Sequence, residues 1–409
     1  MTPPVGGSVA PVAAARAARQ HRHMSRIAAV APVLPEHVYP QAEITAEVAG
    51  LVTRDPRRRA LLEKVHASSG ILTRHTALPL EKYAGLSSFT ETNDVFLREG
   101  LELAARAATD ALTAAGLRPS DVDHLFFTTV TGVSAPSLDA LLVGRLGLRE
   151  DVRRVPSFGL GCAGGAAGLA RVDDHLAGHP DEIALLVSVE LCSLTLQHDD
   201  DSTANLVASG LFGDGAAAAV LVGDRRAAAL GVDGPRVVGT RSALYPGTEN
   251  DLGWQVGGSG FRIVLSGGMA ETVAGHAAGD VAALLAPLGA GVGDVAHWVV
   301  HPGGPKILDA VQDALALDPA ALAGSRAALA RSGNLSSAAV LHILADVLAG
   351  PPPDPGALGT VLAFGPGVGA ELVALRWPGG PGGPGGPGGP DGPDGPDEDV
   401  SGSIEEEAS

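Results

Sequence analysis

The sequence predicts an α/β fold in which helices cover a mixed β-sheet. Apolar, β-rich runs alternate with amphipathic helical stretches between about residues 25 and 377. The second half of this region repeats the order of the first, and we place the two halves at 24–230 and 231–377. Hydrophobic residues make up 45% of the 409 residues and charged residues 18%, which is enough apolar material for a large core.

Each element of the first half has its own signal. The run at 99–116 has apolar residues at helical spacing and stops at a glycine, whereas 123–132 is a short β-rich run that also ends in glycine. The stretch 182–191 is a continuous apolar run of strand length. We expect strands at 25–35, 123–132, 182–191 and 216–223, and helices at 99–116, 137–148 and 162–178.

The second half has a similar order of predicted strands and helices. A β-rich run at 236–244 precedes a long amphipathic stretch at 269–289. The run at 295–304 ends in a Pro-Gly-Gly turn, which ends a strand and leads to a helix. We expect strands at 236–244, 295–304, 359–367 and 371–377, and helices at 269–289, 306–317 and 336–350.

The two ends of the chain differ from this core. Residues 1–23 are rich in Ala and Pro without a clear pattern, and we expect a flexible arm there. Residues 378–409 are Gly/Pro-rich and contain eight acids after position 390 but no Lys or Arg. Such a segment cannot bury a core, so we expect a disordered acidic tail.

Charge and cysteine content narrow the function classes. The formal net charge of −18 argues against a nucleic-acid surface, which needs clustered cations. Two cysteines cannot form a disulfide framework or a Cys-rich zinc site. No signal peptide and no apolar run of membrane length is visible, so we expect a cytoplasmic protein that binds no membrane. The run HDDD at 198–201 has metal-binding residue types, but adjacent acids in a loop more often face water, and we expect no metal site.

One cysteine, Cys162, lies in GLGCAGG, where a strand-like run becomes helical. A thiol at a helix N-terminus has a lowered pKa and can act as a nucleophile. Small neighbours leave room for a ligand. The alternative, a small buried cysteine that fills a gap, is about as probable from this stretch alone.

Two further residues extend this hypothesis. His301 follows a β-rich run and precedes a turn, a position from which it can face a cleft; the alternative is a loop histidine. Asn334 precedes a Ser-rich helix start, where it is either a helix N-cap or an amide donor facing the same site. Together the three residue types fit a nucleophile, a base and an oxyanion donor.

The local motifs resemble those of the type III polyketide synthases, the chalcone and stilbene synthase family of the thiolase superfamily. The matching pieces are GLGCAGGAAGL, SGLFGDGAAAAVLVG, HWVVHPGGPKILDAV, SGNLSSAAVL and AFGPGVGAE, which follow the family's order across nearly the whole predicted core. The related ketosynthase III enzymes, which depend on an acyl carrier protein, typically have HQAN where this chain has HPGG.

The resemblance implies a thiolase fold with a duplicated αβαβα layered core, a homodimer, and a decarboxylating Claisen condensation of coenzyme A thioesters without a cofactor. Cys162 would be the nucleophile that holds the acyl chain. His301 would keep the thiol ionised and, with Asn334, bind the malonyl thioester oxygen. Phe212 matches the family's gatekeeper between the CoA tunnel and the cavity.

The resemblance also implies cavity and CoA-binding residues. Cys192, Thr195 and Ser336 match positions that line or shape the cavity, and Ala135 replaces a methionine that reaches into the partner subunit of plant members. CoA phosphates need local cations in an acidic protein. The candidates are Lys64, Arg58 and Lys306, and the alternative for each is a solvated surface cation.

The resulting prediction is an acyltransferase that loads an acyl-CoA starter and extends it with malonyl-CoA or methylmalonyl-CoA. Residues 190–223 resemble bacterial members that make alkylpyrones or alkylresorcinols from fatty acyl starters. Two alternatives are a ketosynthase III-like enzyme that depends on an acyl carrier protein and a non-catalytic partner of another synthase.

Overall fold

The computed structural model describes residues 24–351 and 353–379. Its main feature is a nine-stranded mixed sheet with the strand order β11-β12-β13-β8-β1-β7-β6-β4-β5. The predicted arm at 1–23, and all of the predicted tail at 378–409 except its first two residues, lie outside the described residues.

The first half of the sheet contains five strands. They are β1 (Arg26–Val33), β4 (His124–Thr129), β5 (Arg153–Phe158), β6 (Ile183–Leu191) and β7 (Asp214–Val222). Strand β4 pairs in parallel with β5 and β6, whereas β7 runs antiparallel to both β6 and β1.

The second half contains four strands. They are β8 (Arg236–Leu244), β11 (Val295–Val300), β12 (Leu358–Gly365) and β13 (Gly369–Arg376). Their order, β11-β12-β13-β8, repeats the order β4-β6-β7-β1 of the first half with the same parallel and antiparallel pairings. The two halves join where Arg26 of β1 pairs with Arg236 of β8. The duplication predicted from the sequence is therefore confirmed in the sheet.

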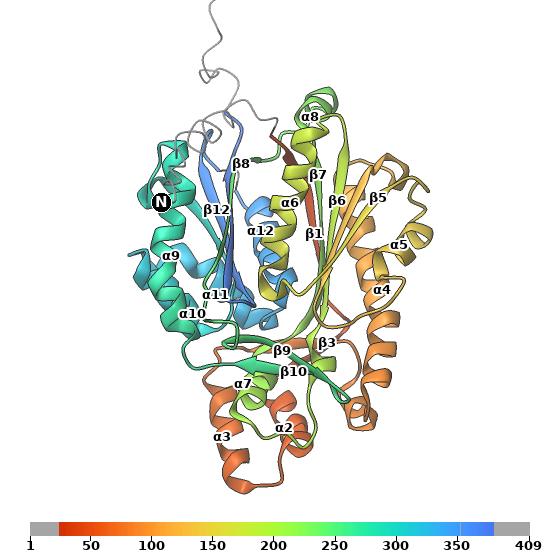
Figure 1. Ribbon diagram of the computed structural model, residues 1–409, viewed down its shortest axis with the longest axis vertical. Coiled ribbons are helices and arrows are strands. Elements are labelled where there is room, and N and C mark those ends of the chain that lie inside the picture. Colours follow the sequence, from red (N-terminus) through yellow and green to blue (C-terminus); the bar gives the residue numbers. More distant parts are fainter. Residues whose placement is uncertain (1–23, 352, 380–409) are drawn as a thin grey trace, which may run out of the picture.

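Helices form three layers around the two half-sheets (Figure 1). Helices α4 (Phe89–Ala114) and α5 (Leu138–Leu146) cover the first half, and α9 (Met269–Leu285) and α10 (Pro305–Ala314) cover the second. Helices α6 (Gly164–Gly178) and α12 (Ala339–Ala349) lie between the halves and contact strands of both. This arrangement is the αβαβα layering of the thiolase fold.

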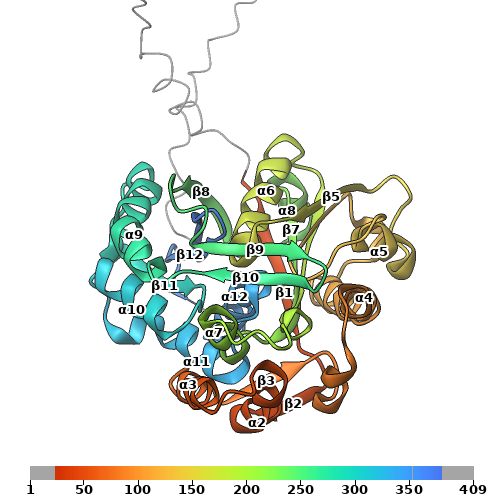
Figure 2. The same ribbon diagram turned by 60° about the horizontal axis from the view of Figure 1, so that its bottom comes forward.

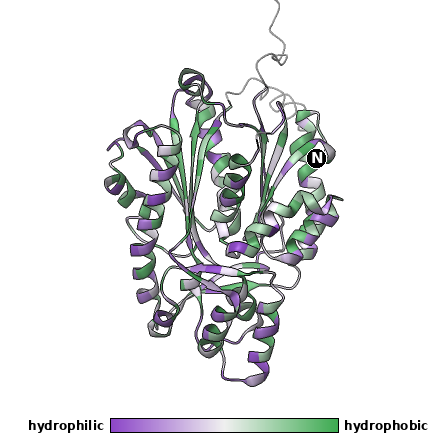
Figure 3. Ribbon diagram, turned by 180° about the vertical axis from the view of Figure 1, so that it is seen from behind, coloured by the Kyte–Doolittle hydropathy of each residue, from purple (hydrophilic) through white to green (hydrophobic). Residues whose placement is uncertain are grey.

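The hydrophobic cores follow these layers. One cluster lies under α4, one around the central helices α6 and α12, and one under α9 and α10. Strands β6 and β7 are buried along their whole length. Figure 3 shows the strands mostly green and the outer helices mixed green and purple, as expected for helices that bury one face.

A smaller group of elements closes one end of the sheet (Figure 2). The sequence gives this group no separate signal, except that 54–70 is basic. Its members are β2 (His37–Pro40), α2 (Gln41–Val52), α3 (Pro56–Ala67), β3 (Thr73–Thr76), α7 (Thr203–Leu211) and the hairpin β9 (Leu252–Gly257) and β10 (Gly260–Leu265). The remaining helices are α8 (Asp224–Leu230) and α11 (Ala323–Ser332). No helix among the described residues is long and apolar enough to cross a membrane.

Helix α4 begins ten residues earlier than the predicted range of 99–116. Ser88 caps it, because its hydroxyl accepts a hydrogen bond from the backbone N–H of Glu91 at 3.3 Å. The Glu91 carboxylate in turn accepts from the Ser87 backbone at 2.8 Å. This capping starts the helix in a polar stretch where hydrophobic spacing gives little signal.

The central helices approach each other through glycine. A Cβ atom added at Gly165 in the first turn of α6 would lie 2.3 Å from the backbone oxygen of Ser337, just before α12. Only glycine permits this approach, and it brings the N-terminal ends of the two central helices together.

Gly165→Ala should therefore lower the free energy of unfolding by about 1–3 kcal/mol, because the methyl group meets backbone that must shift. Gly178 at the other end of α6 is a matched control, since an added Cβ there meets nothing within 4 Å. Gly178→Ala should leave stability unchanged or raise it by up to about 1 kcal/mol. Denaturant unfolding measures both variants, and equal effects would contradict the role assigned to the close approach.

Candidate active site

Cys162 lies in a 3-10 turn, Gly161–Ala163, that leads into α6. The preceding residue, Gly161, has φ +52°, and an added Cβ there would lie 2.4 Å from the ring of Pro366. The turn after β12 thus packs directly against the cysteine turn. The side chain of Cys162 is buried, so the tight turn fixes where the sulfur faces.

Asn334 lies in the equivalent place before α12, next to the cysteine. Its backbone pairs with Phe212, donating to the Leu211 oxygen at 2.8 Å and accepting from Gly213 at 3.0 Å. Its side-chain oxygen accepts from the backbone N–H of Ser336 at 2.8 Å and faces the Cys162 sulfur at 4.0 Å. With the oxygen engaged in this way, the amide NH₂ is the group that can donate to a ligand.

His301 follows the last residue of β11 and is buried. Its backbone N–H donates to the Leu362 oxygen of the neighbouring strand at 2.8 Å, which fixes the residue at the strand end. Both ring nitrogens are buried without a hydrogen-bond partner. Because buried polar atoms normally have partners, these nitrogens mark a place where a polar ligand atom or water is expected.

These three residues line one cavity of about 450 Å³, a size typical of small-molecule sites. Phe212 and Lys306 line it as well, and Lys306 is exposed to solvent. The structure therefore brings five of the predicted residues to one site. Its apolar walls include Val65, Leu211, Leu252, Leu265, Met269 and Phe364.

A second, narrow cavity of about 50 Å³ lies on the other side of Phe212, which lines both. Cys192 and Thr195 line this second cavity, together with the buried side chains of Arg74 and Tyr83. Phe212 thus stands between the space that holds Cys162 and the space that holds two predicted cavity residues.

Four predicted residues do not line either cavity. Ser336 lies behind the nucleophile, with its hydroxyl 3.8 Å from the Cys162 sulfur. Ala135 is exposed, next to a cis bond to Pro136. Arg58 donates to the backbone oxygen of Asp201 at 2.9 Å, and Lys64 is exposed on α3. Val65 of α3 and the two residues that follow the helix, Ser68 and Ser69, line the cavity instead.

The protonation of the site differs from the sequence-based expectation. Burial raises the pKa of Cys162 to about 12, although the contacts of the sulfur with the Ser336 and Asn334 side chains oppose this shift. Burial also lowers the pKa of His301 to about 3. Both the Cys162 thiol and the His301 imidazole therefore favour the neutral form. This differs from the lowered thiol pKa predicted from the sequence, because the cost of burying the charged thiolate exceeds its stabilisation by the helix N-terminus.

The sequence analysis did not single out Glu190, a fully buried acid at the end of β6. One carboxylate oxygen accepts from the Val130 backbone at 3.1 Å and from Thr131 at 3.0 Å, and the other accepts from Ser336 at 3.3 Å. Burial raises the pKa of Glu190 to about 7, and its charge helps to raise the pKa of Cys162. The signal that points to it is a single acid in an otherwise apolar strand.

The raised pKa of Glu190 predicts a pH-dependent stability. The folded state holds this proton up to about pH 7, whereas the unfolded chain releases it near pH 4.5, so stability falls as pH rises through this window. In Glu190→Gln, the amide can keep the bonds from Val130 and Thr131 and face the serine hydroxyls with its NH₂ group. We expect the variant to gain about 2–3 kcal/mol relative to the wild type between pH 4.5 and 8. Denaturant unfolding of both proteins at pH 4.5 and pH 8 measures this gain. A stability difference between the variant and the wild type that is the same at both pH values would contradict the prediction.

Comparison with known proteins agrees with this architecture. The model of the N-terminal domain of chalcone and stilbene synthases matches residues 12–225, and that of the C-terminal domain matches residues 237–377. The chain is 53% identical over 351 residues to a 1,3,6,8-tetrahydroxynaphthalene synthase of Streptomyces peucetius subsp. caesius, a match that covers 86% of this chain and 93% of that protein. It is 30% identical over 350 residues to a phloroglucinol synthase of Pseudomonas fluorescens, covering 84% and 97% of the two chains.

Among solved structures, the chain resembles 1,3,6,8-tetrahydroxynaphthalene synthase from Streptomyces coelicolor A3(2), a bacterial type III polyketide synthase. The TM-score is 0.81 with 33% identity, and the match covers 86% of this chain and 99% of that chain. The motifs, the duplicated layers and both family models agree. The chain belongs to the chalcone and stilbene synthase family and is a type III polyketide synthase, an acyltransferase that catalyses decarboxylative Claisen condensation.

Proposed function

We propose that this enzyme condenses malonyl-CoA units on Cys162 into a polyhydroxylated naphthalene of the 1,3,6,8-tetrahydroxynaphthalene type. The observation that carries this proposal is the 53% identity to a 1,3,6,8-tetrahydroxynaphthalene synthase over 86% of the chain. A second synthase of this name, from Streptomyces coelicolor, is 34% identical over 84% of the chain.

The residues of the site support the steps of this reaction. The Cys162 thiol attacks the starter thioester, loses its proton and displaces CoA, which leaves as a thiol. Malonyl-CoA then loses carbon dioxide, and the enolate oxygen accepts hydrogen bonds from His301 and the Asn334 NH₂ group. A neutral imidazole still has one N–H to donate, so the lowered pKa of His301 is compatible with this role. The enolate carbon attacks the carbonyl of the acyl-cysteine and displaces the Cys162 thiolate. The chain, longer by two carbons, is then carried by CoA and returns to Cys162 for the next extension.

The fatty acyl starter and the alkylpyrone or alkylresorcinol product predicted from the sequence form the second candidate. The apolar walls of the 450 Å³ cavity favour it, since Leu252, Leu265 and Met269 offer no polar group to a carboxylated starter. In both candidates we propose that Lys306, an exposed residue that lines the cavity, binds CoA phosphates, and the CoA contacts of Lys64 and Arg58 also stay predictions.

Product analysis separates the candidates. The full chain is incubated with isotope-labelled malonyl-CoA alone, and then with starters from acetyl-CoA to long-chain acyl-CoA, with mass spectrometry of the products. We expect a polyhydroxynaphthalene from malonyl-CoA alone. Product that appears only with a fatty acyl starter would favour the second candidate, and strict dependence on an acyl carrier protein would favour a ketosynthase III-like enzyme.

We also propose that the enzyme is a homodimer joined through the edge strand β5. This strand ends the sheet, and its side chains Val155 and Phe158 are 41% and 49% exposed. An exposed edge strand that carries large apolar side chains is a surface that a second copy can pair with. Sedimentation should give twice the chain mass of 40.9 kDa, and a monomer that turns over at the full rate would overturn the proposal.

A further inference from the structure

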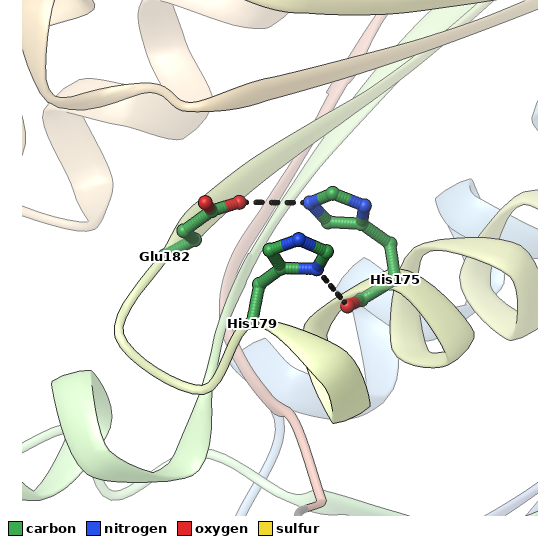
Figure 4. A group of neighbouring side chains, drawn as sticks. All are labelled: His175, His179 and Glu182. Atoms are coloured by element: carbon green, nitrogen blue, oxygen red, sulfur yellow. Dashed lines mark hydrogen bonds and ion pairs between the residues drawn. The ribbon is translucent and has the colours of Figure 1, made fainter.

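Three side chains with metal-binding atoms meet at the C-terminal end of α6, far from the active site. They are His175, His179 and Glu182, and one ligand atom of each lies within 4.8 Å of those of the other two. Figure 4 shows the two imidazole rings and the carboxylate turned toward one another. Helix α6 has 15 residues and is therefore about 22 Å long, so the group lies at the opposite end of the helix from Cys162.

The end of α6 brings these residues together. His175 lies in the last turn of α6 and His179 directly follows the helix, and their rings are stacked with centroids 4.3 Å apart. Helix α6 ends at Gly178, and the short turn that follows brings Glu182 back beside them before β6 begins. The Glu182 carboxylate accepts a hydrogen bond from Nε2 of His175 at 2.8 Å.

The second histidine has the form that metal ions bind. Nδ1 of His179 donates to the backbone oxygen of His175 at 2.9 Å, so in the neutral ring the lone pair is on Nε2. A backbone carbonyl on the other ring nitrogen is the usual arrangement that orients a metal-bound histidine. The rings of His175 and His179 are stacked with an interplanar angle of 10°, so one ring has to turn for both lone pairs to meet at one ion.

A third histidine lies beside the pair. His175 is stacked between His124 and His179, with ring centroids 4.0 and 4.3 Å apart. Nδ1 of His124 is itself buried without a hydrogen-bond partner. Three imidazole rings therefore gather beside Glu182 at this end of α6.

We propose that His175, His179 and Glu182 bind one borderline transition-metal ion of the Zn²⁺, Co²⁺ or Ni²⁺ class. Two imidazoles and one carboxylate with a water in the fourth position are a known ligand set for Zn²⁺. The ion replaces the proton shared by His175 and Glu182, and that proton is released to solvent. It also competes with Arg153, which forms an ion pair with Glu182.

The ion would join the end of α6 to the start of β6 and so stabilise the fold. It takes no part in the condensation, for which the sequence predicts no metal. This inference does not depend on which product the enzyme makes.

The test is a titration of the metal-free, untagged full chain with Co²⁺, followed by visible absorption, and with Zn²⁺ by calorimetry. His21 and His23, outside the described residues, are replaced by alanine in every protein used. We expect one equivalent of Zn²⁺ with a dissociation constant below about 10 µM, and a higher melting temperature with Zn²⁺ than with chelator.

His179→Ala and Glu182→Gln should each weaken binding at least about tenfold, since each removes a ligand. His276→Ala is the matched control, because Nδ1 of His276 on α9 makes the same bond to the carbonyl four residues earlier, at 2.9 Å, without belonging to the cluster. It should bind like the parent. Undiminished binding in His179→Ala, or equal loss in His276→Ala, would overturn the site. Circular dichroism of each metal-free variant shows that it is folded before titration.

Discussion

Cys162→Ala should abolish acyl-enzyme formation and lower condensation by at least about 10³-fold, because Cys162 is the one cysteine among the residues that line the cavity. The sulfur lies in the wall of the 450 Å³ cavity beside His301 and Asn334, at the turn that begins α6. Mass spectrometry of the intact protein after incubation with an acyl-CoA, together with product formation, measures both effects.

Cys192→Ala is the matched control for this prediction. Cys192 is the only other cysteine of the chain, and it is also buried, but it lines the narrow cavity beyond Phe212. Burial raises the pKa of Cys192 as it raises that of Cys162, so the two variants differ in which cavity loses its thiol. The control should keep the acyl adduct on Cys162. Normal turnover by Cys162→Ala, or loss of the adduct in Cys192→Ala, would contradict the assignment.

Much of the fold follows from hydrophobic patterning, because most of its elements are either fully buried strands or helices with one apolar face. The prediction of 236–244 as a strand coincides with β8, and the predicted range 269–289 contains all of α9. The start of α4 depends instead on capping by Ser88, and the hairpin of β9 and β10 is partly exposed. Local polar contacts and tertiary pairing define these elements, and neither produces a periodic pattern.

For the active site, the sequence predicted which residues meet but not their charge states. The motifs around Cys162, His301 and Asn334 identify residues that the fold brings to one cavity. The charge states could not be predicted, since the pKa of Cys162 depends on how completely distant segments bury it. The same holds for Lys64 and Lys306: both are cations in the sequence, but only packing decides that Lys306 lines the cavity and Lys64 does not.

Asn334→Asp should lower the rate of malonyl-CoA decarboxylation by about 10²–10³-fold, the usual effect of losing one oxyanion donor. The carboxylate keeps an oxygen for the Ser336 backbone N–H, which is 2.8 Å from the Asn334 oxygen, but it has no NH₂ group to donate to the enolate. The backbone bridge to Phe212 does not involve the side chain, so the cavity walls should stay in place.

Two partial reactions make this prediction specific to Asn334. Loading of an acyl group from acyl-CoA needs the thiol and should be less affected by Asn334→Asp than decarboxylation of malonyl-CoA, which needs a stabilised enolate. Ser336→Ala is the control, because it removes a hydroxyl 3.8 Å from the same sulfur and leaves the amide donor intact. If Asn334→Asp decarboxylates malonyl-CoA at the wild-type rate, the amide is not the donor. If Asn334→Asp instead slows loading and decarboxylation by the same factor, the substitution acts by changing the Cys162 thiol, on which both reactions would then depend.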